Sequence, residues 1–206
     1  MTSKKVPDII IARLPLYLRT LSEMNERGQQ TTSSKELSEI VAVSAAQIRK
    51  DLSQFGEFGK QGTGYNIPFL IEQLKKILKV DRVWDVAVVG MGNMGHAIAR
   101  YQGFVNRSFR IVMLFDNDPD KIGKQVGSMT IRSTSELSQT IRNAGIKVIM
   151  LTVPASVAQE VTDTLVGAGV KAILSYAPII LNVPEGVNIR YIDPAVHLQW
   201  MTYYLE

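Results

Sequence analysis

Six residues in the middle of the chain, Gly90-Met91-Gly92-Asn93-Met94-Gly95, have the types and spacing of a loop that binds the phosphates of a dinucleotide. In such a loop the first glycine makes a tight turn, the second lets the backbone approach a pyrophosphate, and the third lets a helix touch a strand. The helix that follows supplies N–H donors and a dipole that favours an anion. Glycines alone are weak evidence, so the interpretation depends on the elements around them.

The surrounding residues have the order that this chemistry requires. The glycine loop directly follows the β-branched run Val83–Val89, and the second expected strand, Phe109–Phe115, is followed by Asp116. Asp116 lies 21 residues beyond Gly95, where a carboxylate binds the hydroxyls of the adenosine ribose. The sequence therefore predicts a dinucleotide site rather than a bare tight turn. Because Asp116 would repel a 2′-phosphate, NAD is favoured over NADP.

Residues that could use a bound dinucleotide for catalysis are scarce. The nicotinamide is expected beside Thr152-Val153-Pro154 and Ser175–Pro178, because ligands of such sheets lie beyond the carboxyl ends of the strands. Both loops are small and apolar, no Tyr-x-x-x-Lys pair occurs, and His197 is expected to pack within a terminal helix. The roughly 125 residues after residue 82 leave no room for a substrate domain. We therefore expect no catalytic residue and no enzyme.

A second set of reactive side chains lies nearer the N-terminus. Ser33 and Glu36, and then Ser44 and Gln47, are spaced as capping boxes, which predicts a helix to about Val41 and another over Ile48–Ser53. The turn between them, residues 42–44, is short enough for a helix-turn-helix. On the second helix glutamine can pair with adenine, arginine with guanine and lysine with phosphate. The alternative is a surface helix with ordinary solvated charges.

The segment that follows strengthens the nucleic-acid interpretation. Phe55–Tyr65 contains four glycines between aromatic and basic residues, which predicts a hairpin with a mobile tip. A basic side chain such as Lys60 at that tip can enter a narrow minor groove. The candidate DNA contacts are Ser44, Gln47, Arg49, Lys50, Lys60, Gln61, Gly62 and Tyr65.

Composition agrees with these two activities and excludes others. The chain has 206 residues, 46% of them hydrophobic, and no cysteine, so disulfides, thiolate metal sites and cysteine nucleophiles are excluded, and we expect no metal. Residues 1–80 hold 12 basic and 8 acidic side chains, whereas the remainder holds 11 of each. A basic N-terminal segment beside a neutral remainder favours DNA binding slightly. With no apolar signal region or membrane-length apolar stretch, a cytoplasmic protein without a membrane partner is expected.

Periodicity predicts how the chain divides. A helix over Val6–Met24, kinked or restarted at Pro15, and a helix over about Phe69–Leu78 complete a winged-helix domain, residues 1–80. Strands then alternate with helices, which predicts an α/β fold with a Rossmann-type parallel sheet, residues 81–192. The strands are expected at about 83–89, 109–115, 129–131, 147–152, 172–174 and 189–192, and the helices at 94–102, 135–143 and 157–166. Residues 193–206 form a last helix, apolar on all sides, which predicts insertion against a second subunit.

This combination resembles the Rex family of redox-sensing transcriptional repressors, nearly from end to end. The resemblance rests on Ile48–Gly56, on Gly59–Tyr65, on the glycine loop, on Leu151–Pro154 and on Ala177-Pro178. It implies a homodimer that exchanges its C-terminal helices, binds double-stranded operator DNA when free or bound to NAD⁺, and releases the DNA when NADH binds. It also implies that the regulated genes are those of fermentation and respiration.

The resemblance further implies a switch made of Arg19, Tyr101 and Asp193, which would link the DNA-binding domain, the nicotinamide pocket and the other subunit. The chain departs from the family pattern at Gln61, where a second basic wing residue is usual, and at Pro194, where a bulkier side chain can stand.

An apolar pocket of Val153, Pro154, Ala177 and Pro178 should favour the neutral reduced ring over the cationic oxidised ring.

Two other functions remain open from the sequence. The first is a small NAD-dependent oxidoreductase, which would turn NADH over with a substrate. The second is a winged-helix protein whose sheet binds another nucleotide such as coenzyme A, which would not respond to NADH.

Overall fold

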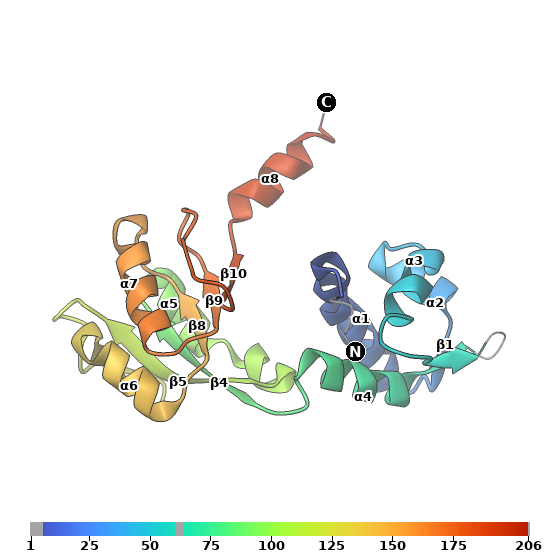
Figure 1. The fold of residues 1–206 in the computed structure, drawn as a ribbon, viewed down its shortest axis with the longest axis horizontal. Coiled ribbons are helices and arrows are strands. Elements are labelled where there is room, and N and C mark those ends of the chain that lie inside the picture. The colour runs from blue at the N-terminus through green and yellow to red at the C-terminus, as the bar shows by residue number, and fades with distance from the viewer. Residues whose placement is uncertain (1–5, 61–63, 206) are drawn as a thin grey trace. The chain divides into compact units, whose positions relative to one another are not determined.

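A computed structural model describes residues 6–60 and 64–205, which form two compact units that divide after Arg82 (Figure 1). The dividing point lies two residues beyond the expected boundary after residue 80. No helix of the described residues is long and apolar enough to cross a membrane. Each unit has its own hydrophobic core, so each is described by itself.

The first unit is built from four helices and a small sheet. Its helices are α1 (Asp8–Glu26), α2 (Ser34–Val41), α3 (Ala45–Leu52) and α4 (Ile67–Leu78). The strands β1 (Thr31–Thr32), β2 (Gly59–Lys60) and β3 (Gly64–Asn66) pair antiparallel in the order β1-β3-β2. The core joins all four helices through side chains such as Tyr17, Leu37, Ile48 and Leu70. This is the expected winged helix, with the extra strand β1 on the side of β3 away from β2.

Local chemistry explains where these helices begin. The hydroxyl oxygens of Ser33 and Ser44 accept hydrogen bonds from the backbone N–H groups of Glu36 and Gln47, which confirms both expected caps. The second cap starts α3 at Ala45, so the expected start at Ile48 was wrong by three residues. The prediction of a restart at Pro15 was also wrong, because α1 is continuous across this exposed residue.

Close backbone contact explains one glycine of the wing. Gly64 has φ +76°, and a Cβ there would lie 2.4 Å from the carbonyl oxygen of Thr32 on β1. Only glycine tolerates both the left-handed conformation and this approach. The tip of the wing, with Gln61 and Gly62, lies outside the described residues.

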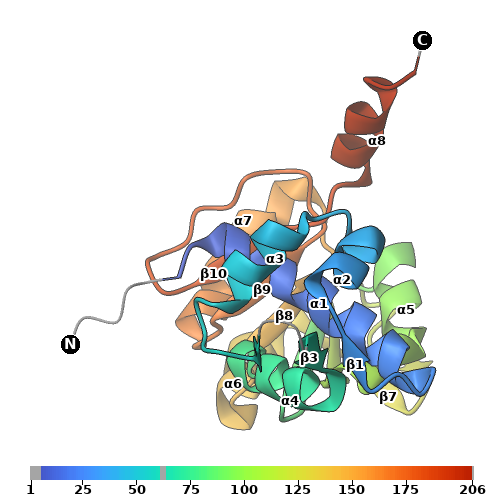
Figure 2. The same cartoon turned by 90° about the vertical axis from the view of Figure 1, so that its right-hand side faces the viewer.

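The second unit is a seven-stranded sheet covered on both faces by helices (Figure 2). Its strands are β4 (Trp84–Val89), β5 (Phe109–Asp116), β6 (Gln125–Val126), β7 (Met129–Ser133), β8 (Val148–Leu151), β9 (Ala172–Ser175) and β10 (Asn188–Tyr191). The helices are α5 (Asn93–Arg100), α6 (Leu137–Ala144), α7 (Ala155–Gly167) and α8 (Pro194–Thr202), with short 3₁₀ turns at Gln102–Arg107 and Thr134–Glu136.

The strand order is β10-β9-β8-β4-β5-β7-β6, parallel except for β6, which pairs antiparallel with β7. The chain moves outward from β4 through β5 to β7, then returns to β8 beside β4 and moves outward the other way. This reversal is the switch point at which Rossmann-type sheets bind dinucleotides, so the expected fold class is confirmed.

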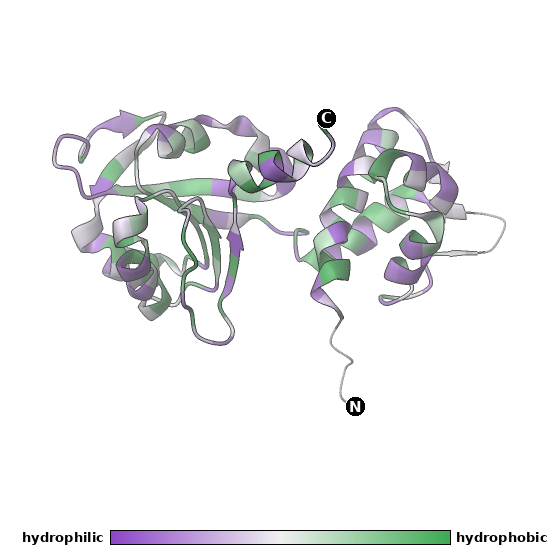
Figure 3. Ribbon diagram, turned by 90° about the horizontal axis from the view of Figure 1, so that it is seen from above, coloured by the Kyte–Doolittle hydropathy of each residue, from purple (hydrophilic) through white to green (hydrophobic). Residues whose placement is uncertain are grey.

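Alternate residues of the central strands contribute to two separate cores. The colouring of these strands shows that they are largely hydrophobic (Figure 3). Ala87 and Val89 face α6 and α7, whereas Val86 and Val88 face α5. Only the last four residues of β4, Val86–Val89, are buried, and all four are apolar, as expected for a strand segment covered on both faces.

Candidate dinucleotide site and DNA-binding surface

The glycine loop connects β4 to α5, and contacts from two neighbouring strands hold it. Gly90 has φ +98°, and a Cβ there would lie 2.7 Å from the carbonyl oxygen of Thr152. The Thr152 hydroxyl donates to the carbonyl oxygens of Gly90 and Val89 at 2.6 and 3.1 Å. A Cβ on Gly95 would lie 2.0 Å from the Gly90 carbonyl oxygen. Gly90 and Gly95 are thus required by the fold of the loop itself.

Gly92 differs from the other two glycines of the loop. It caps the N-terminus of α5 with φ −76° and ψ −167°, and no heavy atom lies within 4 Å of the position that a Cβ would occupy. Gly92, Asn93 and Met94 are exposed, whereas Met91 is buried beneath the loop. The free space above Gly92 is therefore where an anion could approach the first N–H groups of α5.

Asp116 lies at the carboxyl end of β5 beside this loop and is 5% exposed. Its carboxylate accepts hydrogen bonds from the N–H groups of Met91 and Asp118 at 2.6 and 2.8 Å and pairs with Lys121 at 3.3 Å. Burial opposes ionisation, but these donors outweigh it and hold the pKa of Asp116 below its usual value. A carboxylate whose charged form is favoured thus lies next to the glycine loop.

The residues expected around the nicotinamide occupy different environments. Val153 is half-buried, while Pro154 and Pro178 are exposed beyond the carboxyl ends of β8 and β9. The side chain of Ala177 is 3% exposed and packs in the core formed with α6 and α7. An apolar surface beside the loop therefore consists of Val153 and the two prolines rather than of all four residues.

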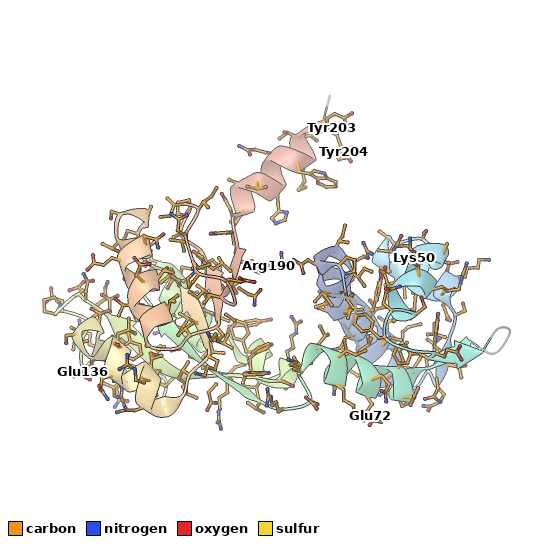
Figure 4. The ribbon with its side chains drawn as sticks, viewed as in Figure 1. Lys50, Glu72, Glu136, Arg190, Tyr203 and Tyr204 are labelled. Carbon is orange, nitrogen blue, oxygen red and sulfur yellow. The ribbon has the colours of Figure 1, made fainter. Side chains whose placement is uncertain are left out.

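The DNA-binding candidates cluster on α3. Ser44 caps the helix, and Arg49 and Lys50 are exposed; Figure 4 labels Lys50. The Arg49 guanidinium donates to the Ser34 hydroxyl at 2.9 Å. Gln47 is half-buried, and its side-chain amide nitrogen donates to a carboxylate oxygen of Asp51 at 2.6 Å. Exposed cations on one helix of a helix-turn-helix can contact DNA phosphates and bases.

The DNA-binding candidates of the wing occupy different positions. Lys60 lies in β2, and Gln61 and Gly62 fall outside the described residues. Tyr65 on β3 packs against the core of the first unit, and burial raises the pKa of its phenol. This position indicates a packing role for Tyr65, and its contact with DNA stays a prediction.

The three switch candidates each have a local partner. Arg19 on the exposed face of α1 pairs with Glu23 at 2.9 Å. Tyr101 follows α5 and stacks edge-on against Phe104, with ring centroids 5.0 Å apart. The Asp193 carboxylate caps α8 by accepting from the N–H of Ala195 at 2.9 Å.

Helix α8 projects away from its own sheet in both views (Figures 1 and 2). Most of its residues are exposed, including His197, and the large apolar ones are Val196, Leu198, Trp200 and Met201, followed by Tyr203, Tyr204 and Leu205. Figure 4 shows the two tyrosines at its outer end. A surface of this kind is typical of an interface.

Sequence reasoning missed the residues behind α3. Asp51 is completely buried and is bound by Arg13 and Tyr17 of α1. The available signal was an acidic residue three positions after Ile48 and one before Leu52, on the inward face of an amphipathic helix. Among the described residues, no group of three potential metal ligands comes together.

Comparison with family models agrees with this division of the chain. A family described as "Putative DNA-binding protein N-terminus" matches residues 5–53, and one described as "CoA binding domain" matches residues 81–179.

Curated relatives and solved structures are similar over almost the whole chain. "Redox-sensing transcriptional repressor Rex" of Roseiflexus sp. (strain RS-1) is 55% identical over 97% of this chain and 90% of the relative. The protein of the same name from Streptomyces coelicolor is 42% identical over 98% of this chain and 78% of the relative.

Two of the solved structures contain the same protein in different complexes. The structure "RSP in complex with beta-NAD+ and operator DNA" matches with a TM-score of 0.92 at 37% identity, covering 98% of this chain and 93% of that one. "RSP in complex with beta-NADH" matches with a TM-score of 0.89 at 35% identity, covering 98% and 95%.

Proposed function

The chain belongs to the Rex family of redox-sensing transcriptional repressors, and from this premise we propose that it represses transcription by binding operator DNA as a homodimer and releases the DNA when NADH replaces NAD⁺. The observation that carries the proposal is that one chain contains both a helix-turn-helix with exposed cations and a Rossmann switch point with a free glycine and a charged carboxylate. A repressor must reach the chromosome, and this supports a cytoplasmic location as part of the proposal.

The cofactor is held at the carboxyl ends of β4, β5 and β8. Gly92 and the first turn of α5 would hold the pyrophosphate, because their N–H groups and the helix dipole favour an anion and the space above Gly92 is open. Asp116 would accept hydrogen bonds from the hydroxyls of the adenosine ribose through Oδ1, which accepts from the N–H of Asp118 and keeps a second lone pair, whereas Oδ2 already accepts from Met91 and Lys121. The hydroxyl of Thr152 holds the glycine loop by donating to the carbonyl oxygen of Gly90.

Val153, Pro154 and Pro178 would hold the nicotinamide, whereas the side chain of Ala177 is buried in the core. The oxidised ring carries a positive charge and the reduced ring none, so a dry apolar surface binds NADH better. A ligand shifts an equilibrium only by its differential affinity for the two states, so NADH must prefer the arrangement that cannot bind DNA.

The DNA surface is α3 with the wing. Arg49 and Lys50 supply contacts to bases and phosphates, with Ser44, Gln47 and Tyr65 as further candidates. The wing candidates Lys60, Gln61 and Gly62 stay predictions from the sequence. Two recognition helices of a dimer must fit major grooves about 34–36 Å apart. A change in the angle between subunits therefore prevents simultaneous contact.

The dimer forms through α8. Exposed apolar side chains on all sides of one helix cost free energy in water, and a second subunit can cover them. Asp193 lies at the base of this helix, and we assign to it, Arg19 and Tyr101 the coupling of the cofactor to DNA release. In this assignment the Arg19–Glu23 pair is exchanged for another partner, which is inexpensive because both residues are exposed.

The two other functions are disfavoured by particular observations. A dehydrogenase needs a proton donor near the nicotinamide, and of the two histidines His96 lies on α5 with its ring nitrogen 3.1 Å from the Gly92 carbonyl, while His197 lies on α8. The family described as a coenzyme A binding domain covers residues 81–179, whereas the redox-sensing relatives cover 97–98% of the chain.

Fluorescence anisotropy on a labelled palindromic operator tests the proposal, with NADH, NAD⁺ and coenzyme A titrated separately at constant salt, since phosphate contacts make affinity salt-dependent. We expect release by NADH at concentrations where NAD⁺ and coenzyme A leave the complex intact. Release by coenzyme A alone would support the other nucleotide-binding function. Binding that ignores all three ligands would refute redox sensing, and turnover of NADH would support an oxidoreductase.

A further inference from the structure

The inner face of α3 contains a carboxylate that the proposed function does not use. Helix α3 buries Ile48, Asp51 and Leu52, and Asp51 is 0% exposed. An aspartate is almost never fully buried unless its charge is paired. Its side chain also cannot touch DNA, so any role in recognition must be exerted through other residues.

Helix α1 supplies three of the four hydrogen bonds to Asp51. The Arg13 guanidinium donates from Nε and Nη2 at 2.6 and 2.7 Å to the two carboxylate oxygens, and the Tyr17 hydroxyl donates at 2.7 Å. A two-point guanidinium–carboxylate contact fixes orientation as well as distance. The rotation of α3 about its own axis is thereby fixed relative to α1.

The fourth hydrogen bond connects the buried carboxylate to the outer surface of α3. The amide nitrogen of Gln47, one turn earlier, donates to Asp51 at 2.6 Å. Gln47 is half-buried and, with Lys50 and Gln54, lines a hollow of about 480 Å³ between α3 and the start of α1. The amide is therefore held from the inside and accessible from the outside.

A held amide keeps the groups that base recognition requires. A primary amide has two N–H donors and one carbonyl acceptor, and the bond to Asp51 uses a single N–H. The remaining N–H and the oxygen are the pair that glutamine presents to N7 and N6 of adenine. Fixing this amide before binding reduces the entropy that is lost when it meets a base.

We propose that Asp51 is a positioning residue for operator recognition, which holds α3 on α1 and orients the Gln47 amide toward the base edges. This inference rests on the proposed function, because it specifies how the operator-binding surface acquires its sequence preference. The carboxyl remains ionised near neutral pH, because the hydrogen bonds of Arg13, Tyr17 and Gln47 outweigh the effect of burial and lower its pKa. The positioning is thus a permanent feature of the first unit.

The test compares affinity for the operator with affinity for a random duplex of equal length, using the full chain without NADH. Asp51→Asn keeps the shape but cannot accept all four hydrogen bonds. Tyr17→Phe removes one donor from a fully buried side chain and is the milder variant. Ile67→Val, in the core of the same unit on α4, is the control for simple loss of stability. Thermal unfolding establishes that each variant is folded at the assay temperature.

We expect Asp51→Asn to lower operator affinity about tenfold, the size of one lost base-reading pair, and Tyr17→Phe to act in the same direction. Affinity for the random duplex should change less than about twofold, because phosphate contacts remain. Ile67→Val should leave the ratio of the two affinities unchanged. With Gln47→Leu already present, Asp51→Asn should lower this ratio less than it does in the wild-type background, because part of its effect passes through that amide.

An unchanged ratio in folded Asp51→Asn and Tyr17→Phe would overturn the proposal, as would an equal further loss in the Gln47→Leu background. Should Asp51→Asn fail to fold, Tyr17→Phe alone decides the outcome by the same criterion. A wild-type chain that binds operator and random duplex equally would instead refute the proposed function itself.

Discussion

Replacing Gly92 with alanine separates cofactor binding from folding. Gly92 has φ −76° and ψ −167°, a conformation open to alanine, and an added Cβ meets no heavy atom within 4 Å. The methyl group therefore fits the protein without cofactor. It would occupy the space through which a pyrophosphate reaches the N–H groups of α5.

Gly92→Ala should change the free energy of unfolding much less than it changes the affinity for NADH. Replacing glycine by alanine at a compatible position stabilises the folded state by about 0.4–1 kcal/mol, because it reduces the conformational entropy of the unfolded chain. Losing the glycine at the helix N-cap destabilises the folded state by about the same amount. The free energy of unfolding should thus change by less than about 0.5 kcal/mol, as at an unconstrained surface site. Forcing a methyl group into a close contact costs about 1–3 kcal/mol, which corresponds to a loss of NADH affinity of about fivefold to 150-fold.

Gly95→Ala is the matched comparison, because its Cβ would lie 2.0 Å from the Gly90 carbonyl oxygen. It should lower the free energy of unfolding of the second unit by about 1–3 kcal/mol or more. NADH fluorescence titration and thermal unfolding on both variants give the two quantities, and operator anisotropy then shows whether Gly92→Ala still binds DNA but no longer releases it with NADH.

Two results would refute the reasoning. Wild-type NADH affinity in Gly92→Ala would mean that no pyrophosphate lies over this loop. A melting temperature as low as that of Gly95→Ala would mean that the space above Gly92 is already occupied in the protein without cofactor.

Three further predictions concern acid stability, assembly and DNA affinity. The pKa of Asp51 is lowered in the folded state, so its contribution to stability is complete above the unfolded value of about 3.9 and is lost as pH falls through the folded pKa. Urea unfolding of wild type and Asp51→Asn between neutral and acid pH should show that the free energy of unfolding falls less steeply with acid in the variant. Equally steep falls in the two proteins would contradict this. Deleting residues 194–206 should yield a monomer in sedimentation analysis, and a persistent dimer would exclude α8 as the interface. Lys50→Ala should reduce the slope of log affinity against log salt by about 0.9 without changing NADH affinity, and an unaltered slope would mean that Lys50 does not contact phosphate.

Features set by neighbours in the chain could be predicted from the sequence. The glycine loop, the caps at Ser33 and Ser44 and the alternation of strands and helices depend on residues a few positions apart. The errors arose where pairing partners are distant. Strands β1 and β6 have two residues each and are held by β3 and β7, so neither has a periodicity of its own. Pro15 was expected to kink or restart a helix, yet α1 does not restart there, and the neighbouring Leu14 and Tyr17 are fully buried in the core.

The sequence by itself therefore determined the two kinds of site, since a phosphate-binding turn and an amphipathic recognition helix are encoded by local spacing. Only the tertiary structure decided which side chains are available to a ligand. Ala177 lies in the core, and Gln47 is held by a carboxylate that Arg13, 38 residues away, also binds. The physical reason is that burial and hydrogen bonding depend on what the rest of the chain brings to a residue, and spacing along the sequence does not specify those partners.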